Sequence, residues 1–353
     1  MIFDRLPIPI VQAPLGGGPS TPALAAAVSG AGGLGFLAAG YRSPRVMAEE
    51  IATVRGLTGR PFGVNLFAPV PGPAGREAVE RYAARLEPEA RRMGVNLGEP
   101  RFDRDAFEEK IDRLLRDPVP LVSFTFGCPS AAIISSLREV GSETWATVTD
   151  VEEAELAEAA GASALVVQGL EAGGHRGFFV DGKGASDYSV LALVQLAGAR
   201  VRIPLVAAGG ISTGGAVAAV LAAGAAAAQL GTAFMRCPEA GTSEVHRAAL
   251  ASSRPTSLTR AFSGRSARGV VNRFMRDYDL DAPVAYPEVH HLTAPLRARG
   301  REEGDEDVVN LWAGQTHELA RPLPAADLVR ELARAARGAL KVAGERLSRS
   351  HFR

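Results

Sequence analysis

The segment Gln168–Gly177, with the sequence QGLEAGGHRG, has the residue types best suited to catalysis. His175 is the only histidine in the first 245 residues, and an imidazole that ionises near neutral pH is suited to removing a proton from a substrate. Gly173 and Gly174 leave this loop free to approach a ligand closely. Gln168 can both donate and accept hydrogen bonds. We therefore predict that His175 is the catalytic residue, although a lone histidine is more often structural.

Two further segments carry glycines and hydroxyl groups that can bind a phosphate. Gly209–Gly214 follows one predicted strand and leads into a helix, where free backbone amides favour an anion. The next predicted strand ends in Gln229, Leu230, Gly231 and Thr232. In this last group the glycine admits a ligand to the backbone, and the threonine adds a hydroxyl group. We predict that both segments hold one phosphate; the alternative is two ordinary turns.

The same region favours a rival interpretation, because Gly210–Gly214 matches the GxSxG pattern of serine hydrolases. Ser212 would be the nucleophile, and Glu244 and His246 would complete a triad. A serine at the start of an alanine-rich helix is also an ordinary helix cap. A second pattern, GxGxxG at Gly30–Gly35, lies between a predicted helix and a predicted strand. A dinucleotide site needs the reverse order, so a glycine turn is the simpler interpretation.

Three other positions are weaker candidates. The amide of Asn65, at a strand end, can bind a planar ligand or a substrate oxygen, but structural capping explains it equally well. Cys128 is better explained as a small core residue than as a redox group. His290 and His291 are adjacent, so their side chains point apart, and no carboxylate spacing completes a metal site. We therefore predict no metal.

The elements that position these residues alternate between short apolar runs and helical runs. Eight such strands alternating with helices predict an α/β protein with a (β/α)8 TIM barrel. A doubly wound open sheet is the alternative, because periodicity does not show closure. The expected strands are Pro9–Ala13, Leu34–Ala38, Phe62–Phe67, Leu121–Thr125, Thr144–Thr147, Ala164–Gln168, Pro204–Ala207 and Ala228–Leu230. The expected helices between them are Thr21–Ser29, Ser43–Gly56, Pro129–Val140, Asp150–Ala159, Tyr188–Ala197 and Thr213–Ala222.

Two stretches interrupt the alternation and predict an inserted helical cap over one mouth of the barrel. We expect residues 1–68 and 121–240 to form the barrel. Residues 69–120 are expected to be a helical insertion that is part of the cap, and residues 241–322 the rest of it. Residues 323–353 are expected to pack on the barrel as a C-terminal helix.

The composition excludes several classes of protein. The 353 residues include 39 basic and 39 acidic ones, and this balance argues against nucleic acid or a membrane surface as the main partner. Two cysteines exclude a disulfide framework and a thiolate zinc site. There is no signal-peptide pattern and no apolar run of about 18 residues, the length that spans a membrane. We expect a cytoplasmic protein, either a monomer or a homodimer.

Together these segments resemble the nitronate monooxygenase family, formerly called 2-nitropropane dioxygenases, and most closely its class I. The similarity extends over nearly the whole chain, and the QGLEAGGHRG loop is its most specific part. One departure is Leu15, where the family usually has methionine. The matching segments are Pro9–Pro14, Gly16–Gly18, Ala31–Gly35, Gly63–Phe67, Ser123–Gly127, Gln168–Gly177, Ala207–Ser212, Gln229–Phe234, Arg260–Arg265 and Leu311–Gln315.

The resemblance implies a capped TIM barrel that binds one FMN non-covalently and no metal. It implies that His175 faces the substrate and that Gln12, Ala13 and Pro14 lie against the flavin ring. The remaining residues implied to bind FMN, some of them through its phosphate, are Asn65, Gln168, Gly173, Gly174, Gly209, Gly210, Gln229, Leu230, Gly231 and Thr232.

The reaction implied is the FMN-dependent oxidation of alkyl nitronates by O2 to a carbonyl compound and nitrite, with His175 as base or hydrogen-bond donor. One alternative is an FMN-dependent NAD(P)H reductase that acts on quinones or enoyl thioesters. Another is an FMN-binding protein without catalysis. The sequence does not decide the physiological substrate or the role of the charged segment Arg297–Asp307.

Overall fold

The structure is a computed structural model that describes residues 1–70, 72–182 and 187–349. Within these residues eight parallel strands form one sheet: β1 (Ile10–Gln12), β2 (Gly35–Ala38), β3 (Phe62–Phe67), β4 (Leu121–Thr125), β5 (Glu143–Val148), β6 (Ala164–Gln168), β8 (Leu205–Ala208) and β9 (Ala227–Leu230). Their order is β1-β9-β8-β6-β5-β4-β3-β2. Each expected strand is present, and no bound differs from its expected position by more than one residue.

The sheet curls until its first and last strands meet. The amide of Gln12 donates to the carbonyl of Leu34 at 2.9 Å, and the amide of Leu34 donates to the carbonyl of Ile10 at 3.0 Å. Leu34 immediately precedes β2, so these bonds join β1 to β2. The barrel prediction is therefore confirmed, and the open-sheet alternative is wrong.

The side chain of Gln12 reinforces this seam, by which we mean the junction of β1 and β2 that closes the barrel. Its Oε1 accepts from the amide of Phe36 at 2.9 Å, and its Nε2 donates to Ser20 Oγ at 3.0 Å. The side chain is fully buried, so both bonds are shielded from water. Gln12 thus joins two strands and a loop of the barrel.

Apolar side chains fill the barrel interior. Phe36, Trp145, Val166 and Val206, from four different strands, belong to one buried cluster. Phe3, from the N-terminal 3-10 helix Ile2–Arg5, stacks on Trp145 with ring centroids 5.1 Å apart. The N-terminal segment thus packs against this filled interior.

The helices that surround the barrel start at well-defined caps. Each of these six helices follows a Ser, Thr or Asp whose side chain accepts a hydrogen bond from the backbone amide three residues later, which satisfies an otherwise unpaired group. They are α1 (Pro22–Gly30), α2 (Pro44–Leu57), α5 (Ala131–Glu139), α6 (Val151–Ala160), α7 (Val190–Gly198) and α8 (Gly214–Ala222).

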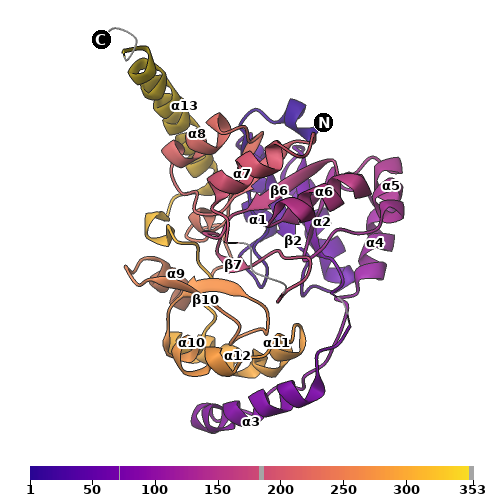
Figure 1. Cartoon of the computed structure of the whole chain (residues 1–353), viewed down its shortest axis with the longest axis vertical. Coiled ribbons are helices and arrows are strands. Elements are labelled where there is room, and N and C mark those ends of the chain that lie inside the picture. The colour runs from indigo at the N-terminus through magenta and orange to yellow at the C-terminus, as the bar shows by residue number, and fades with distance from the viewer. Residues whose placement is uncertain (71, 183–186, 350–353) are drawn as a thin grey trace.

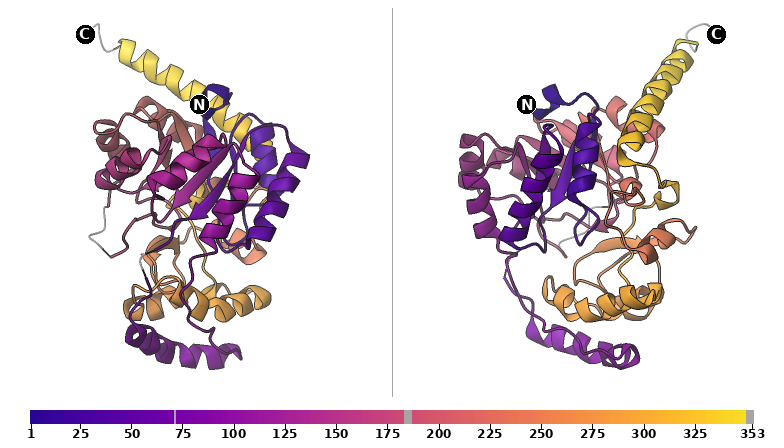
Figure 2. Two further views of the ribbon diagram at one scale, coloured as in Figure 1. Left: turned by 90° about the vertical axis from the view of Figure 1, so that its right-hand side faces the viewer. Right: turned by 180° about the vertical axis from the view of Figure 1, so that it is seen from behind.

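Two more helices complete the outer layer. α13 (Ala325–Arg349) packs on α8 and α1, and its C-terminal end projects beyond the barrel (Figures 1 and 2). α4 (Phe107–Arg116) packs against α2 and α5, and Phe107 and Leu114 share an apolar cluster with barrel residues. We therefore propose that α4 belongs to the barrel and that only the preceding part of the 69–120 insertion belongs to the cap.

The cap lies at one end of the barrel. α3 (Arg76–Met93), α10 (Arg273–Tyr278), α11 (Glu288–Leu292) and α12 (Ala294–Glu303) share one apolar core. α3 is the part of the cap farthest from the barrel (Figures 1 and 2). Near the cap lie α9 (Glu244–Leu250) and the 3-10 helices Thr232–Phe234, Asp279–Asp281, Glu306–Val308 and His317–Leu319.

A small antiparallel sheet connects the cap to the barrel, and the sequence analysis did not predict it. Its strands are β7 (Gly174–His175), β10 (Thr256–Thr259) and β11 (Ala267–Val270). β7 lies in the loop after β6, and β10 and β11 lie in the cap segment. Both cap strands have only four residues, too few to show a clear alternation.

In residues 1–70, 72–182 and 187–349, no helix combines the length and the apolar character that crossing a membrane requires.

The seam leads to a prediction about Gln12. Replacing Gln12 by Leu leaves the buried amide of Phe36 without its acceptor, so the free energy of unfolding is expected to fall by roughly 1–3 kcal/mol. Urea denaturation followed by circular dichroism measures this change. Gln195→Leu, at an exposed position of α7, is the control and is expected to change stability by less than about 0.5 kcal/mol. Equal stability of the two variants would contradict the structural role of Gln12.

Candidate functional site

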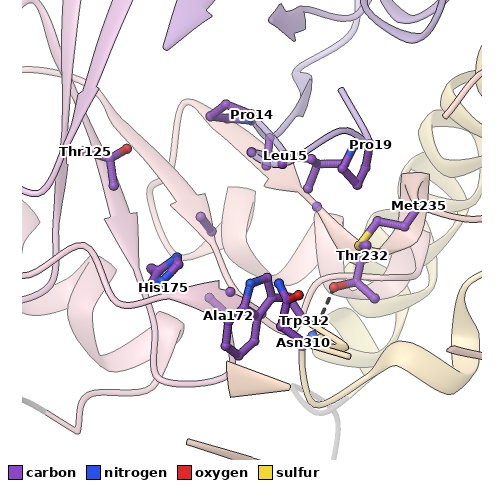
Figure 3. Close-up of a pocket in the computed structure, with 18 of the residues that line it drawn as sticks. Pro14, Leu15, Pro19, Thr125, Ala172, His175, Thr232, Met235, Asn310 and Trp312 are labelled. Carbon is purple, nitrogen blue, oxygen red and sulfur yellow. Dashed lines mark hydrogen bonds between the residues drawn. The ribbon is translucent and has the colours of Figure 1, made fainter. Parts of the chain in front are cut away.

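A cavity of about 460 Å3 opens at the carboxyl ends of the barrel strands, between the barrel and the cap. This volume lies within the roughly 300–1,000 Å3 typical of small-molecule sites. The barrel contributes Pro14, Thr125 and Thr232 to its wall, and the cap contributes Asn310 and Trp312 (Figure 3).

Most of the site residues predicted from the sequence lie together on this cavity. Two do not line it: Gln12 forms the seam described above, and Leu230 is buried in the core between barrel and helices. The twelve that line it are Ala13, Pro14, Asn65, Gln168, Gly173, Gly174, His175, Gly209, Gly210, Gln229, Gly231 and Thr232.

The side chain of Gln168 holds the glycine-rich loop in place. Its Nε2 donates to the carbonyl of His175 at 3.0 Å, and its Oε1 accepts from the amide of Gly177 at 2.9 Å. The loop also lies very close to the cap. A Cβ on Gly173 would lie 2.4 Å from the amide nitrogen of Gly314, so only glycine fits there.

Three buried arginines fasten the same loop through its carbonyl oxygens. Arg176 donates to the carbonyl of Gly169 at 2.6 Å, and Arg268 donates from Nε to that of Leu170 at 3.0 Å. Arg265 donates from Nε to the carbonyl of Arg176 at 3.3 Å. These bonds hold the carbonyl groups of the loop in fixed positions.

The imidazole of His175 is held by a hydrogen bond through its Nε2 atom. Its Nε2 lies 2.9 Å from Ser263 Oγ, and that hydroxyl donates to the carbonyl of Arg265 at 3.2 Å. When that hydroxyl donates to Arg265 it accepts from the imidazole, and the proton of the neutral ring is then on Nε2 and the lone pair on Nδ1.

The ionisation of His175 differs from the expectation. Burial, followed by the charges of Arg265 and Arg297, lowers the pKa of His175 to about 3. The sequence analysis expected ionisation near neutral pH, whereas the burial of this imidazole and the positive charges beside it lower its pKa. The imidazole is neutral at physiological pH.

Aromatic rings surround this imidazole. Phe126, Tyr286 and Trp312 have ring centroids 5.7, 5.8 and 5.4 Å from that of His175. The guanidinium carbon of Arg265 lies 4.0 Å from the centroid of Phe126 on a face of that ring. The imidazole therefore has little rotational freedom.

The loops after β8 and β9 expose backbone to the cavity. Gly209 and Gly210 have φ values of +120° and +66°, which favour glycine. Among the described residues, no hydrogen bond is recorded for the amides of Gly210, Gly231 and Thr232. Thr232 Oγ1 accepts from the amide of Gly314 at 3.0 Å, which links this end of the cavity to the cap segment (Figure 3). Free amides beside the cavity can bind an anion.

The serine hydrolase interpretation is wrong. Ser212 Oγ lies 2.8 Å from Thr316 Oγ1, and His246 Nε2 donates to the carbonyl of Trp312 at 2.9 Å. The side chain of Glu244 is 95% exposed, so it does not orient a buried imidazole. The GxGxxG pattern is the turn between α1 and β2, as expected, and does not line the cavity.

The structure explains the two weaker candidates Asn65 and Cys128 without a catalytic role. Asn65 donates to Ser123 Oγ at 2.9 Å and to Thr125 Oγ1 at 3.1 Å. Burial raises the pKa of Cys128 to about 11, so its thiol is protonated and unreactive at neutral pH.

The adjacent histidines have different partners, although their ring centroids lie only 5.4 Å apart and the side chains do not point apart as expected. His290 stacks on Tyr41 at the cavity, and His291 Nε2 lies 2.7 Å from Asp103 Oδ2. Within the part of the chain that the structure describes, no group of three or more His, Cys, Asp or Glu side chains is arranged to hold a metal.

The charge of the cavity wall is one-sided. Its charged side chains are Arg297 and Arg301, and no Asp or Glu lines it among the described residues. The cavity therefore favours anionic ligands over cationic ones.

Comparison with known proteins assigns the family. A family model described as nitronate monooxygenase matches residues 3–335 of the chain. The chain belongs to the nitronate monooxygenase family. It is accordingly an enzyme of the oxidoreductase class.

Individual relatives of the family agree with this assignment. The nitronate monooxygenase of Pseudomonas aeruginosa is 44% identical over 346 residues, which cover 94% of this chain and 96% of that protein. A solved nitroalkane oxidase from Streptomyces ansochromogenes superposes with a TM-score of 0.94 at 50% identity and covers 97% of this chain and 99% of its own. FabK from Thermotoga maritima superposes with a TM-score of 0.75 at 26% identity and covers 98% and 97%, respectively.

Some residues beside His175 were not predicted as site residues. Ser263 and Trp312 lie in segments that match the nitronate monooxygenase family, so those segments were the available signal. Arg297 belongs to the charged segment Arg297–Asp307, whose role the sequence does not decide, and only 7% of it is exposed. No sequence motif marked Tyr41, because only the folding of the chain brings this residue to the cavity.

The state of His175 can be tested directly. Because its pKa is about 3, its imidazole is expected to stay neutral, with the proton on Nε2, down to pH 5. NMR spectra of protein with 15N-labelled histidine measure the protonation state, and His175→Asn identifies the signal. The urea-unfolded protein is the control, in which histidines titrate near about 6.5. A folded-state titration of His175 between pH 5 and 7 would contradict the burial argument.

The same shift has a consequence for stability. The unfolded chain binds more protons than the folded one between pH 6.5 and about 3, so His175 lowers stability progressively as the pH falls through that window.

Proposed function

We propose that this protein oxidises alkyl nitronates with O2, using FMN bound in the cavity, and releases a carbonyl compound and nitrite. Membership of the nitronate monooxygenase family supports the reaction. The observation that carries the proposal is the single cavity that joins the free amides of Gly210, Gly231 and Thr232 to the neutral imidazole of His175. Since no acidic side chain lines it among the described residues, it suits an anionic cofactor and an anionic substrate.

The proposed reaction balances without another oxidant. Each nitronate loses two electrons when its carbon–nitrogen bond becomes a carbonyl group and nitrite leaves. One O2 accepts four electrons and supplies two oxygen atoms. Two nitronate anions and one O2 therefore give two carbonyl compounds and two nitrite ions.

The glycine at position 231 provides a test of whether the cavity fits FMN. Its φ is −105°, which any residue adopts, and an added Cβ would lie 3.4 Å from Leu15 and 3.5 Å from Ala13. Neither the backbone nor the packing therefore requires glycine. A ligand that closely approaches this backbone would explain the missing side chain, and the phosphate of FMN would be such a ligand.

The residues present can hold FMN along the whole cavity. The amides of Gly210, Gly231 and Thr232 would bind the phosphate, and Ala13 and Pro14 would lie beside the ring. When bound, FMN supplies the acceptor for the substrate's electrons and their route to O2. Asn65 and Gln168 line the cavity nearby. In our proposal Gln12 and Leu230, which do not line the cavity, support the site from behind.

His175 would act on the substrate through Nδ1, because Nε2 is committed to Ser263. An anion beside the imidazole offsets the repulsion from Arg265 and Arg297. That favours a proton on Nδ1, which then donates a hydrogen bond to the nitronate.

The low pKa also predicts which substrate form is preferred. A weakly basic imidazole is a poor acceptor for the carbon-bound proton of a neutral nitroalkane at neutral pH. A preformed nitronate needs no proton removal. We therefore expect ethyl nitronate to be oxidised faster than nitroethane.

The test of function is aerobic turnover of ethyl nitronate by the FMN-loaded protein, with O2, nitrite and acetaldehyde all measured. We expect two nitrites for each O2. His175→Asn is expected to lower kcat/KM by about 10- to 100-fold, the size of one hydrogen bond to a charged group, without loss of flavin.

Three results would contradict the proposal. Absence of nitrite from the wild-type protein would remove the function, and an unchanged rate in His175→Asn would remove the role of the imidazole. Anaerobic bleaching of the flavin by NADH, without nitronate turnover, would favour a reductase instead.

The cofactor site has its own prediction. Gly231→Val places a side chain where the phosphate is proposed to bind, so FMN affinity is expected to fall by about 10- to 100-fold, as for overpacking of a filled site. Flavin fluorescence titration of the apoprotein measures this affinity. Gly56→Ala is the matched control, because nothing lies within 4 Å of its added Cβ. Equal FMN affinity in both variants would place the phosphate elsewhere.

A further inference from the structure

A second group of cavity-lining residues, Tyr41, His290 and Arg297, joins the barrel to the cap. The rings of Tyr41 and His290 are stacked, with centroids 4.2 Å apart and an angle of 2° between them. Nη2 of Arg297 lies 3.4 Å from Nδ1 of His290. The phenol and the guanidinium group therefore meet around one imidazole ring.

Arg297 is a buried cation without a counter-ion. Only 7% of the residue is exposed, and its recorded hydrogen bonds are to the hydroxyl of Thr293, at 3.1 Å, and the carbonyl of His290, at 2.6 Å. No carboxylate pairs with it in the described parts of the chain. Burial lowers the pKa of Arg297 to about 10, so it remains charged at neutral pH. Buried charges are normally paired, which indicates that the partner is a ligand.

Helix α12 directs this charge toward the cavity. Ala294, Arg297 and Arg301 all line it, and their spacing of three and four residues places them on one face of the helix. Arg301 is exposed to solvent, so water and salt weaken its field. Arg297 is therefore the stronger attraction for an anion.

Tyr41 offers a hydrogen-bond donor at the same place. Tyr286 donates to its hydroxyl oxygen at 3.1 Å, which leaves the hydroxyl proton of Tyr41 available. The backbone at this residue is left-handed, with φ of +65°. Asp105 accepts from its amide at 3.0 Å, and the buried ammonium group of Lys110 binds both Asp105 and the carbonyl of Ala39. The phenol is thus rigidly positioned.

We propose that Arg297 and Tyr41 form a receptor for the anionic, planar oxygen-bearing group of the substrate, and that they determine the preference for anions. This inference rests on the proposed function, because it assigns to the same cavity the residues that recognise the nitronate. In it Arg297 supplies the charge, Tyr41 supplies a neutral donor, and His290 separates and orients the two.

The location of this receptor agrees with the position of the imidazole that faces the substrate. The ring centroid of Tyr286 lies 5.8 Å from that of His175 and 6.4 Å from that of His290. One aromatic ring therefore lies within reach of both histidines. The charge of Arg297 also acts on His175, whose protonation it opposes. A bound anion would weaken that repulsion.

Nitrate is the probe for this receptor, because it is a planar nitrogen oxyanion that cannot be oxidised further. Calorimetric titration of nitrate into the FMN-loaded protein gives its Kd, and steady-state turnover gives KM and kcat for ethyl nitronate. Arg297→Met is expected to raise both the nitrate Kd and the nitronate KM by about 10- to 100-fold, as for the loss of a charge-assisted hydrogen bond. Its effect on kcat is expected to be smaller.

Matched variants separate charge from packing. Arg297→Lys keeps the charge and is expected to keep most of the nitrate affinity. Tyr41→Phe keeps the stacked ring, loses only the donor, and is expected to weaken nitrate binding by about 3- to 10-fold. Arg299→Met removes an exposed arginine of the same helix and is expected to change nothing. Should Arg297→Met fail to fold, Arg297→Lys and Tyr41→Phe carry the test, because both preserve most contacts.

The outcomes also separate this inference from the proposed function. Wild-type nitrite formation together with unchanged nitrate Kd and KM in Arg297→Met and Tyr41→Phe would overturn the receptor alone. Nitrate binding that depends on Arg297, in a protein that makes no nitrite, would support the receptor and overturn the proposed reaction. Equal loss of affinity in Arg299→Met would show a nonspecific charge effect and would overturn the receptor.

Discussion

Backbone pairing between barrel and cap is the interaction on which the site depends. Gly174 and His175 pair with Arg268 and Ala267 of β11, so a loop that leaves the barrel after β6 becomes a strand of the cap sheet. Gly173 permits this approach, since a side chain there would collide with Gly314. The imidazole is therefore fixed by both parts of the molecule. A loop so rich in glycine would be costly to order without such pairing, because glycine loses the most conformational freedom on folding.

The second constraint is electrostatic. Arg297 and Arg301 line the cavity, no Asp or Glu lines it among the described residues, and Arg265 and Arg297 both oppose the protonation of His175. This arrangement is unfavourable for an imidazolium ion and favourable for a bound anion. Burial is the main reason that His175 is neutral, and this positive charge adds to it while also favouring the proposed nitronate substrate. A carboxylate beside the histidine would orient it equally well, but it would raise the pKa and repel an anionic substrate.

Much of the barrel could be predicted from the sequence, since each strand is a short apolar run between helical segments and loops that the sequence marks with Gly, Pro and polar residues. The carboxyl ends of parallel strands also meet at one end of a barrel. From the sequence alone, Gly210, Gly231 and His175 could therefore be predicted to lie together. The residues that these side chains contact could not be predicted from the sequence. Gln12 sits in a family motif, yet its amide group serves the seam between β1 and β2. Arg297 lies in a hydrophilic run, yet the folded cap leaves only 7% of it exposed. These are long-range properties, which local patterns do not encode.

The two ends of the cavity belong to different parts of the chain. Gly210, Gly231 and Thr232, which we propose bind the phosphate, come from barrel loops. Arg297 comes from the cap, and it completes the proposed anion receptor with Tyr41 of the barrel. On this proposal, changes at Arg297 would act first on substrate binding, whereas changes in the loops after β8 and β9 would act first on the cofactor. The hydrogen bond between Thr232 and Gly314 links the two ends, so the cap segment also helps to hold the cofactor end in place.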